Sequence, residues 1–519
     1  MPTPRSSLSG RETLVLVVLL LVAAWLRFAG LGQGIPFAIG VDEPEILERA
    51  VRMMKTGDFH PDFFDYPTLY IYLQTGVAVL RFMTGAMAGL WATLDQAPSS
   101  EFYLWGRAVT ATLGTATVAL VFLIGRRIGL LAASVGALLL AVQPMHVRES
   151  HFILTDVPMT FFATLAMLLT LRAFDRATPR AYAWPGVAAG LAAATKYHGG
   201  SVLLLPLLSL LLRRGQPDRL RSAGAAIAGA AAAFLVFAPY TVLDLPAFLN
   251  KFGTLSHMYA VGPAAIEPAW ITYLKHLRNN LGWPALLLAG ASLLWAVRET
   301  WRGEVPGRDT PGAAASVRAT WATLAVFVVL TFWLVAGQRL IYARYLLPIL
   351  PPLAVLMGGT LAALAGAVAS RLASPAHRRW ATTALVVLAA GWPAWLSVDA
   401  TRLYARTGTA ELAYRWILAE IPAGAHVAVE SRGLLLPRDH YATENLPTFA
   451  EFDLDHYRAE GYEYLVASSQ AFGPPLTATP PNAATRAYRQ LFDRLQLLTA
   501  IVPTADHPGA EWRVYRLPD

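Results

Sequence analysis

Long apolar segments, separated by short connections that carry arginine, recur through most of this chain. About 20 mostly apolar residues suffice for a helix to cross the hydrocarbon core of a bilayer. The composition agrees, because 55% of the 519 residues are hydrophobic and only 15% are charged, against about 25% charged in an ordinary soluble domain. The sequence predicts a polytopic α-helical membrane protein. We expect spans near residues 13–30, 105–124, 129–146, 155–173, 182–196, 199–213, 223–240, 282–298, 319–337, 345–369 and 380–397.

The arginines between these segments predict how the chain is oriented. Tract 67–94 is also apolar, but it starts at Pro67 and contains Arg81. If it lies along the outer interface without crossing, every later arginine-bearing loop falls on the cytoplasmic side, as the positive-inside rule requires. The prediction is then about eleven spans, with twelve or thirteen as the alternative. The protein would lie in the cytoplasmic (inner) membrane, with the N-terminus cytoplasmic and the C-terminus extracytoplasmic.

The net charge of +8 and the pI near 9.6 follow from the same loops. Arginines at the ends of spans set the orientation and attract anionic lipid head groups. Membrane lipids are therefore the expected partners of this charge, and no nucleic-acid partner is predicted. The chain has no cysteine, which excludes disulfides, thiolate nucleophiles and cysteine metal sites.

The composition changes near residue 400. Residues 1–399 are predicted to form the membrane domain, including a first outer loop at 31–104, and residues 400–519 a small extracytoplasmic α/β domain. About 120 residues is a usual size for one such unit. The short apolar runs that predict its strands are 426–430, 464–469, 498–503 and 512–517, and its helices are expected at 409–420 and 483–496.

The stretch 38–67 is the most acidic connection between apolar segments. Carboxylates at a membrane margin are costly unless they face water, a cation or a reacting group. Asp42 and Glu43 are adjacent at a predicted helix start, before Pro44. Asp42 is either the N-cap of that helix, with Glu45 completing a capping box, or a general base whose pKa is raised in a partly desolvated cleft.

Asp156 is the second acidic candidate, at the start of a predicted span. A helix cap before Pro158 is the structural alternative. A cap does not need the polar cluster that precedes it, which contains Arg148, Glu149 and His151. Asp156 is therefore kept as a catalytic candidate, with Arg148 and His151 as candidates for the same cavity.

Basic residues between the later spans are candidate phosphate ligands. Arginine offers a planar fork to phosphate oxygens, and lysine offers a point charge. Lys196, Arg339 and Arg344 are the candidates, and the alternative for Lys196 and Arg339 is that they extend to the outer interface. Tyr342 and Tyr345 could add hydroxyl donors or belong to an aromatic belt. The remaining polar candidates for the same outer cavity are Asp65, Tyr66, His198 and Tyr240.

Cofactor signals are weak. Several histidines fall in predicted outer connections, but without a recognisable spacing of metal ligands. A divalent cation is an open alternative, and no other cofactor is predicted. The chain contains no GxGxxG or Walker motif, so a nucleotide-driven pump is not expected.

Five stretches, in this order and spacing, resemble the GT-C membrane glycosyltransferases. The resemblance is to the family 39/83-like branch, which includes protein O-mannosyltransferases and aminoarabinose transferases of lipid A. It covers roughly residues 30–360. The stretches read VDEPEILERAVRMMKTGDFHPDFFDYPTLYIYL, GRAVTATLGTATVALVFLIGRRIG, HVRESHFILTDVPMTFFATLAM, AAATKYHGG and RYLLPILPPLAVL.

The resemblance implies an inverting transfer of a sugar outside the cytoplasmic membrane. The donor would be a polyprenyl-phosphate-linked sugar, and the acceptor a lipid, a glycan or a protein. Asp42 matches the catalytic aspartate of the first loop, with Glu43 as its partner. Asp156 matches the acidic residue at the start of the fourth span, and Arg344 with Tyr345 the late-span residues near the lipid phosphate.

The sequence departs from the family at one place. Aminoarabinose transferases carry Lys-Pro-Pro after the first loop and mannosyltransferases carry His-Pro-Pro, whereas this chain reads Asp65-Tyr66-Pro67-Thr68. This puts a direct analogy to either substrate in doubt.

Two other classes of function remain open on the sequence. A transporter or flippase for a lipid-linked sugar would show inverted repeats and charges near mid-membrane. This sequence shows no repeat, and its acidic residues gather at one margin. A structural membrane protein whose outer domain binds a partner is the third reading, opposed only by the density of ionisable residues on the outer side.

Overall fold

The structure is a computed structural model of the whole chain. It describes residues 8–36, 40, 42–213, 218–261, 267–302, 311–430, 434–437 and 440–518. The chain forms two compact units. The membrane unit comprises Met1–Phe28, Ile46–Ala97 and Trp105–Ala400, and the second unit comprises Ala29–Glu45, Pro98–Leu104 and Thr401–Asp519.

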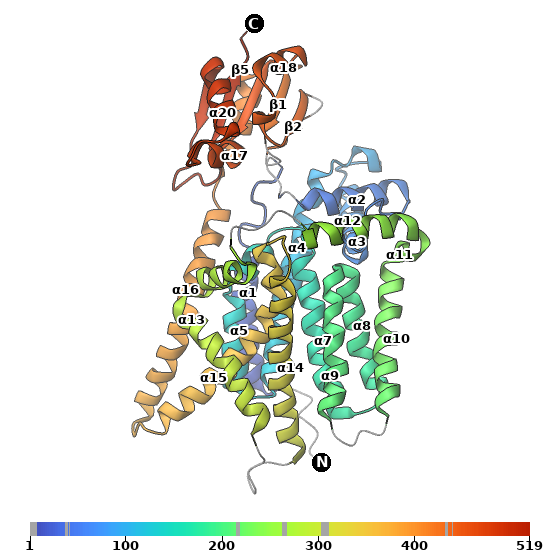
Figure 1. Cartoon of the computed structure of the whole chain (residues 1–519), viewed down its shortest axis with the longest axis vertical. Coiled ribbons are helices and arrows are strands. Elements are labelled where there is room, and N and C mark those ends of the chain that lie inside the picture. Colours follow the sequence, from blue (N-terminus) through green and yellow to red (C-terminus); the bar gives the residue numbers. More distant parts are fainter. Residues whose placement is uncertain are drawn as a thin grey trace. The chain divides into compact units, whose positions relative to one another are not determined.

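Helices make up nearly all of the membrane unit (Figure 1). Their bounds are α1 Gly10–Phe28, α2 Glu43–Thr56, α3 Leu69–Met87, η1 Leu94–Gln96, α4 Ser100–Gly125, α5 Leu130–Ala141, α6 Pro144–Glu149, α7 Asp156–Arg176, α8 Pro179–Thr195, η2 Tyr197–Leu203, α9 Leu204–Leu212, α10 Arg219–Phe237, α11 Tyr240–Leu243, α12 Leu245–Val261, α13 Ala269–Trp301, α14 Pro311–Ala336, η3 Ala343–Ile349, α15 Leu350–Ala369 and α16 Pro375–Tyr404. The first residues of α2 and α4 and the last of α16 belong to the second unit.

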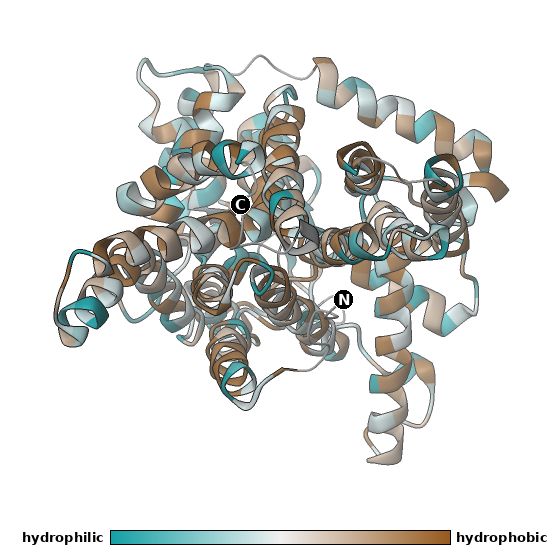
Figure 2. Cartoon of the chain, turned by 90° about the horizontal axis from the view of Figure 1, so that it is seen from below, coloured by the Kyte–Doolittle hydropathy of each residue, from teal (hydrophilic) through white to brown (hydrophobic). Residues whose placement is uncertain are grey.

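Within the described residues, seven helical segments are long and apolar enough to cross a membrane. They lie in α4, α7, α10, α13, α14, η3–α15 and α16. Helices α5 and η2–α9 are apolar but shorter, and tract 67–94 forms α3. A multi-span helical architecture is therefore confirmed, whereas the count of about eleven spans stays a prediction. Hydrophobic residues colour much of these helices in Figure 2.

Small residues allow α8 and α10 to pack closely. Gly186 and Gly190 of α8 face the backbone carbonyls of Ala226 and Ala230 on α10, and a β-carbon at either glycine would overlap them. Glycine four residues apart, facing small residues, is a common way for membrane helices to approach. In Figure 1, α7, α8, α9 and α10 run side by side, whereas α12 runs across the ends of this group.

Helix α13 is kinked at Gly282. This residue has φ 70° and ψ 168° inside the helix, a conformation that glycine adopts without the steric cost of a side chain. The side chain of Trp392 lies against it, leaving little space for a β-carbon. The kink divides α13 into an entry segment and a segment from 283 onward, and the predicted span 282–298 starts at this break.

The second unit contains a five-stranded sheet in the order β2-β1-β3-β5-β4. The strands β1, β2 and β3 are parallel, and β5 pairs antiparallel with both β3 and β4. Their bounds are β1 His426–Glu430, β2 Ala442–Leu446, β3 Tyr464–Ser468, β4 Gln496–Ile501 and β5 Trp512–Arg516. The four predicted strands are present, and β2 was not predicted.

Helices cover both faces of this sheet. Val427 and Val429 of β1 pack with α17 (Thr409–Glu420) on one face. Ala428 faces the other side, where it packs with α18 (Leu454–Ala459), α19 (Ser469–Thr477) and α20 (Ala483–Arg494). The alternation along β1 is the two-residue period of a strand that is buried on both faces. The small α/β region is confirmed, and its extracytoplasmic location stays a prediction.

Candidate functional site

Three charged side chains from separate elements meet in the membrane unit. Asp156 begins α7, Lys196 directly follows α8, and Arg344 lies in the first turn of η3. Lys196 Nζ lies 2.7 Å from Asp156 Oδ1, and Arg344 Nε lies 3.7 Å from Asp156 Oδ2. Asp156 and Lys196 are buried and Arg344 is partly buried. Three sequence-predicted residues therefore form one group, which we call the Asp156 cluster.

Tyrosine rings surround the two cations of this cluster. Lys196 Nζ lies 4.9 Å from the ring centre of Tyr345 and 5.6 Å from that of Tyr66. Arg344 Cζ lies 4.9 Å from the ring centre of Tyr342. At such distances the negative face of an aromatic ring stabilises a cation, the more so where water is excluded. The rings therefore stabilise the positive charges of Lys196 and Arg344.

The two cations of the cluster suit an anion. Both described ionic contacts of Asp156 are made by basic side chains, those of Lys196 and Arg344. A phosphate that approached Arg344 and Lys196 could accept their N–H groups, because both form strong charge-assisted hydrogen bonds with phosphate oxygens.

Tyr259, at the end of α12, extends the cluster by a hydrogen bond. Its hydroxyl lies 2.9 Å from the hydroxyl of Tyr345. Partial burial raises the pKa of Tyr259 above its ordinary value, so this hydroxyl stays protonated at neutral pH and can act as a donor. The spans predicted from sequence left this segment unassigned. Sequence analysis therefore did not predict a role for Tyr259.

Two other predicted residues, Asp65 and Tyr240, lie where the first loop meets α11 and α12. Asp65 Oδ1 lies 3.1 Å from Lys251 Nζ on α12. The ring of Tyr240 lies 4.5 Å from that of His60, whose Nε2 is 3.2 Å from Asp244 Oδ2. These contacts fasten α12, which has no buried residue of its own, to the first loop.

Of the remaining candidates in the membrane unit, His198 has a described ring contact beside the cluster. Its ring centre is 6.0 Å from that of Tyr345. Arg148 instead pairs with its neighbour Glu149 at 2.6 Å. The Nδ1 atom of His151 lies 2.9 Å from the Val147 carbonyl oxygen of its own helix.

Arg339 is exposed, and its described contact is made by its backbone, which donates to the carbonyl oxygen of Tyr259 at 2.9 Å. Contacts to the Asp156 cluster are therefore described for Arg344 and not for the Arg339 side chain. Arg344 is the better-placed candidate ligand of the two.

Asp42 and Glu43 lie in the second unit. Glu43 is buried, and its Oε2 accepts the backbone N–H of Gly40 at 2.8 Å. This contact closes the turn that begins α2, which gives Glu43 a structural role at the helix start. Asp42 directly precedes the helix and is partly exposed. The catalytic roles expected of both residues stay predictions.

Metal ligands are not grouped in the described part of the chain. No three His, Asp or Glu side chains lie close enough together there to hold an ion.

An open apolar groove runs between α13, α14 and the η3–α15 junction. Its volume is about 570 Å³, within the usual range for pockets that bind small molecules. Ile349 and Leu353 line one side, and Lys275 and Arg278 of α13 belong to its lining. Ile349 ends the short helix η3 that carries Arg344. The groove and the Asp156 cluster therefore share one structural element.

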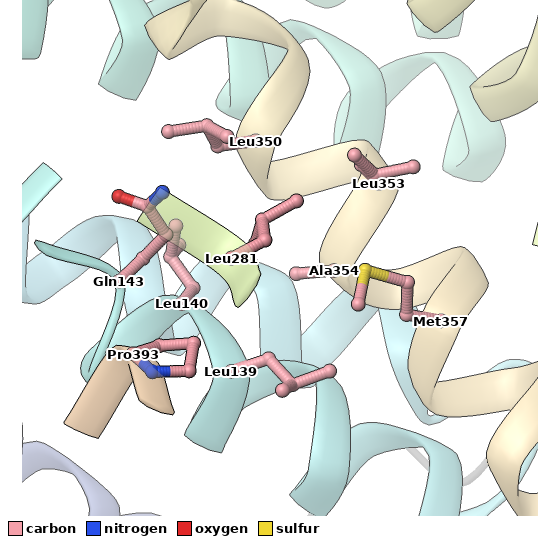
Figure 3. Close-up of a pocket in the computed structure, with 9 residues that line it drawn as sticks. All are labelled: Leu139, Leu140, Gln143, Leu281, Leu350, Leu353, Ala354, Met357 and Pro393. Atoms are coloured by element: carbon pink, nitrogen blue, oxygen red, sulfur yellow. The ribbon is translucent and has the colours of Figure 1, made fainter. Parts of the chain in front are cut away.

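A second cavity, in the helix core, is too small for a substrate (Figure 3). Its volume is about 10 Å³, close to the least that can hold one water molecule. The side chains that line it are nearly all apolar, with Gln143 as the polar exception. They are Leu139, Leu140, Gln143, Leu281, Leu350, Leu353, Ala354, Met357 and Pro393.

Comparison with known families finds a match in the middle of the chain. Residues 46–254 match the family of dolichyl-phosphate-mannose-protein mannosyltransferases. A relative in Candida albicans, dolichyl-phosphate-mannose–protein mannosyltransferase 1, is 29% identical over 203 residues. This match covers 38% of the present chain but only 22% of the relative. The matched segment includes Asp156 and Lys196, whereas Asp42 and Arg344 fall outside it.

Two solved structures resemble the whole chain. ArnT from Cupriavidus metallidurans, bound to undecaprenyl phosphate, has a TM-score of 0.56 at 15% identity, with 98% of each chain covered. The oligosaccharyltransferase of Archaeoglobus fulgidus, tethered to an acceptor peptide, also has a TM-score of 0.56. Its identity is 14%, covering 92% of this chain and 72% of that one.

Together these matches show the fold of the chain and the relationship of its middle segment. The chain has the GT-C fold, and its middle segment is homologous to protein O-mannosyltransferases. The resemblance predicted from the five sequence stretches is thereby confirmed. At 14–15% identity the structural likeness shows the fold alone, so substrate and activity are taken up as proposals.

Proposed function

We propose that this chain is an integral-membrane glycosyltransferase whose donor is a sugar linked to a polyprenyl phosphate. The observation that carries the proposal is the Asp156 cluster, in which a buried lysine, Lys196, and a partly buried arginine, Arg344, converge on one buried carboxylate. Such a group is suited to the phosphate that links sugar and lipid. Undecaprenyl phosphate is the ligand of the similar ArnT structure, which supports the choice of donor class.

The lipid tail of the donor would occupy the groove between α13 and α14. Its lining is almost entirely apolar, and Trp283 and Trp333, which belong to that lining, are well exposed. A tail in this groove and a phosphate at Arg344 would both contact η3. The groove would shield the isoprenoid chain from water. The basic residues would hold the phosphate by charge.

The chemical step would be a displacement at the sugar carbon that carries the phosphate. By its match to the family's first-loop aspartate, Asp42 would take a proton from a hydroxyl or amine of the acceptor, whose freed electron pair forms the new bond to that carbon. The carbon–oxygen bond to phosphate breaks, and its electrons stay on the leaving phosphate. Attack from the opposite side inverts the configuration. Lys196, Arg344 and the hydroxyl of Tyr345 stabilise the charge that grows on the phosphate.

The proposed reaction takes place on the outer side of the cytoplasmic membrane, on a lipid, glycan or protein acceptor. The support is the sequence: carboxylates lie in the connections predicted to be outside, and arginine dominates those predicted to be inside.

The test is transfer of label from lipid-linked sugar. Purified protein in liposomes is given a panel of radiolabelled polyprenyl-phosphate sugars together with membrane extract as acceptor. We expect covalent transfer from at least one donor, lost in Asp42→Asn while the variant keeps its melting temperature. Movement of intact labelled lipid across the bilayer without covalent transfer would instead establish a flippase and refute the enzyme.

A further inference from the structure

Tyr259 connects α12 to the segment that carries Arg344. Its backbone carbonyl accepts the N–H of Arg339 at 2.9 Å, and its hydroxyl lies 2.9 Å from that of Tyr345. Arg339 precedes η3 and Tyr345 lies within it. One residue therefore fixes the end of α12 to this stretch through main chain and side chain at once.

The O–H bond of Tyr345 can rotate, so its proton can point in more than one direction unless a hydrogen-bond partner restricts it. A tyrosine hydroxyl has one proton and can both donate and accept. If Tyr259 donates its proton to the Tyr345 oxygen, the proton of Tyr345 must point elsewhere. The ring centre of Tyr345 lies 4.9 Å from Lys196 Nζ, so the Tyr345 side chain borders the place that an anion held by Lys196 would occupy.

We propose that Tyr259 is a positioning residue for the donor phosphate, acting through Tyr345. The proposal rests on the proposed function, because it needs a lipid phosphate at the Asp156 cluster. Tyr259 donates to Tyr345 and thereby leaves the Tyr345 proton free to be donated to a phosphate oxygen. Tyr259 does not touch the phosphate itself.

The position of Tyr259 gives this hydrogen bond a second consequence. Helix α12 has no buried residue and is held by side-chain contacts, among them Lys251–Asp65 and Asp244–His60. An element with few buried contacts opens at low cost. Opening of α12 would withdraw the Tyr259 hydroxyl and leave Tyr345 unrestricted, so donor binding and the docking of α12 should favour each other.

The experiment measures the affinity of the full-length protein in detergent for undecaprenyl phosphate, which serves as the probe. Four proteins are compared: wild type, Tyr259→Phe, Tyr345→Phe and the double variant. Phenylalanine keeps the ring and removes only the hydroxyl. One hydrogen bond between neutral groups contributes a factor of about five in an equilibrium constant. We expect Tyr259→Phe to weaken binding by about fivefold.

The double variant separates positioning from a general structural effect. If Tyr259 acts through Tyr345, its removal has no further effect once the Tyr345 hydroxyl is gone. The double variant should therefore bind as Tyr345→Phe does. A matched control is Tyr182→Phe, which also removes a buried tyrosine hydroxyl with a hydroxyl partner, Ser209, at 3.3 Å. Tyr182 packs near the far end of α7, roughly 30 Å from Asp156 by helix length, so this variant should bind as wild type.

Two results would overturn the inference. One is equal affinity of wild type and Tyr259→Phe, and the other is a loss that adds fully to that of Tyr345→Phe. A wild-type protein that binds no undecaprenyl phosphate would have a different meaning. It would refute the donor site of the proposed function itself, and the role of Tyr259 would fall with it.

Discussion

The ammonium group of Lys196 lies 2.7 Å from the carboxylate of Asp156, and both side chains are buried. The two residues are 40 positions apart and come from the start of α7 and the end of α8. A connection that reverses direction between these antiparallel helices brings their ends together. The positions of these two helix ends therefore place Lys196, a proposed ligand of the donor phosphate, beside Asp156.

Removing one member of this pair should destabilise the protein more than removing both charges. Lys196→Met leaves a buried carboxylate whose nearest described cation is Arg344 at 3.7 Å. Breaking a buried pair in this way costs about 3 kcal/mol. The double variant Asp156→Asn with Lys196→Met should recover part of that loss, because the carboxylate left without Lys196 is then removed as well. Unfolding in detergent, followed for both variants and wild type, checks the order; a double variant less stable than Lys196→Met would contradict it.

Arg344 should matter for lipid-phosphate affinity far more than Arg339. Arg344 contacts Asp156 and Tyr342, whereas the Arg339 side chain is exposed. Loss of one hydrogen bond to a charged group costs about 1.5–3 kcal/mol, or roughly 10- to 100-fold in affinity. We expect such a loss of undecaprenyl phosphate binding in Arg344→Gln and less than about a twofold change in Arg339→Gln. Equal losses in the two variants, measured by titration at one salt concentration, would argue against the assignment.

Sequence reasoning predicted the members of the Asp156 cluster but not their contacts. Asp156, Lys196 and Arg344 stood out because each is an ionisable residue beside an apolar span, where a charge needs a reason. The family resemblance favoured Arg344 over Arg339, whereas residue type alone did not separate them, because residues in an irregular connection can point either way. Tyr259 was missed for a similar reason. Its segment lacks the long apolar run that identifies a span, and α12 is held in place by tertiary contacts.

Helix packing offers a prediction that is independent of chemistry. Gly186→Ala places a β-carbon against the carbonyl oxygen of Ala226 on α10, which is backbone and cannot rotate away. Overpacking of this kind costs about 1–3 kcal/mol. Gly224→Ala, on α10 itself, is the matched control, because no atom lies within 4 Å of its added β-carbon. Melting temperatures should fall for Gly186→Ala and stay equal or rise for Gly224→Ala; the reverse order would show that α8 and α10 do not pack in this way.

The second unit should lose stability as pH rises through the weakly acidic range. Glu430 ends β1, and its carboxylate accepts the N–H groups of Phe449 and Ser468 and the hydroxyl of Tyr488. Burial outweighs these bonds and raises the pKa of Glu430 above its ordinary value. A folded pKa above the unfolded one gives stability that is fully present below the unfolded pKa, near 4.3. That contribution is lost as pH rises through the folded pKa.

The measurement is hydrogen exchange of peptides from β1 and β3 at several pH values, corrected for intrinsic rates. The opening free energy in the wild type should decrease from about pH 4.5 upward, and Glu430→Gln, which cannot ionise, should show a flatter profile. An equal slope in the two proteins would mean that another group carries the pH dependence.

The sheet illustrates the limit of sequence patterns in the second unit. Strands β1 and β3 were predicted because continuous apolar runs are typical of strands buried on both faces. The sequence of β2, ATENL, is polar and mostly exposed, with pairing described along β1 only. An edge strand of this kind is held by backbone hydrogen bonds to its neighbour, so its side chains carry little signal.

The account depends on a lipid phosphate binding at the Asp156 cluster, and an experimental structure with undecaprenyl phosphate tests this most directly. We predict phosphate density within hydrogen-bond distance of Lys196 Nζ and the Arg344 guanidinium, with the isoprenoid chain entering the groove between α13 and α14. Density for the phosphate at another site, or an Asp156 cluster that stays closed on itself at saturating lipid, would contradict the account.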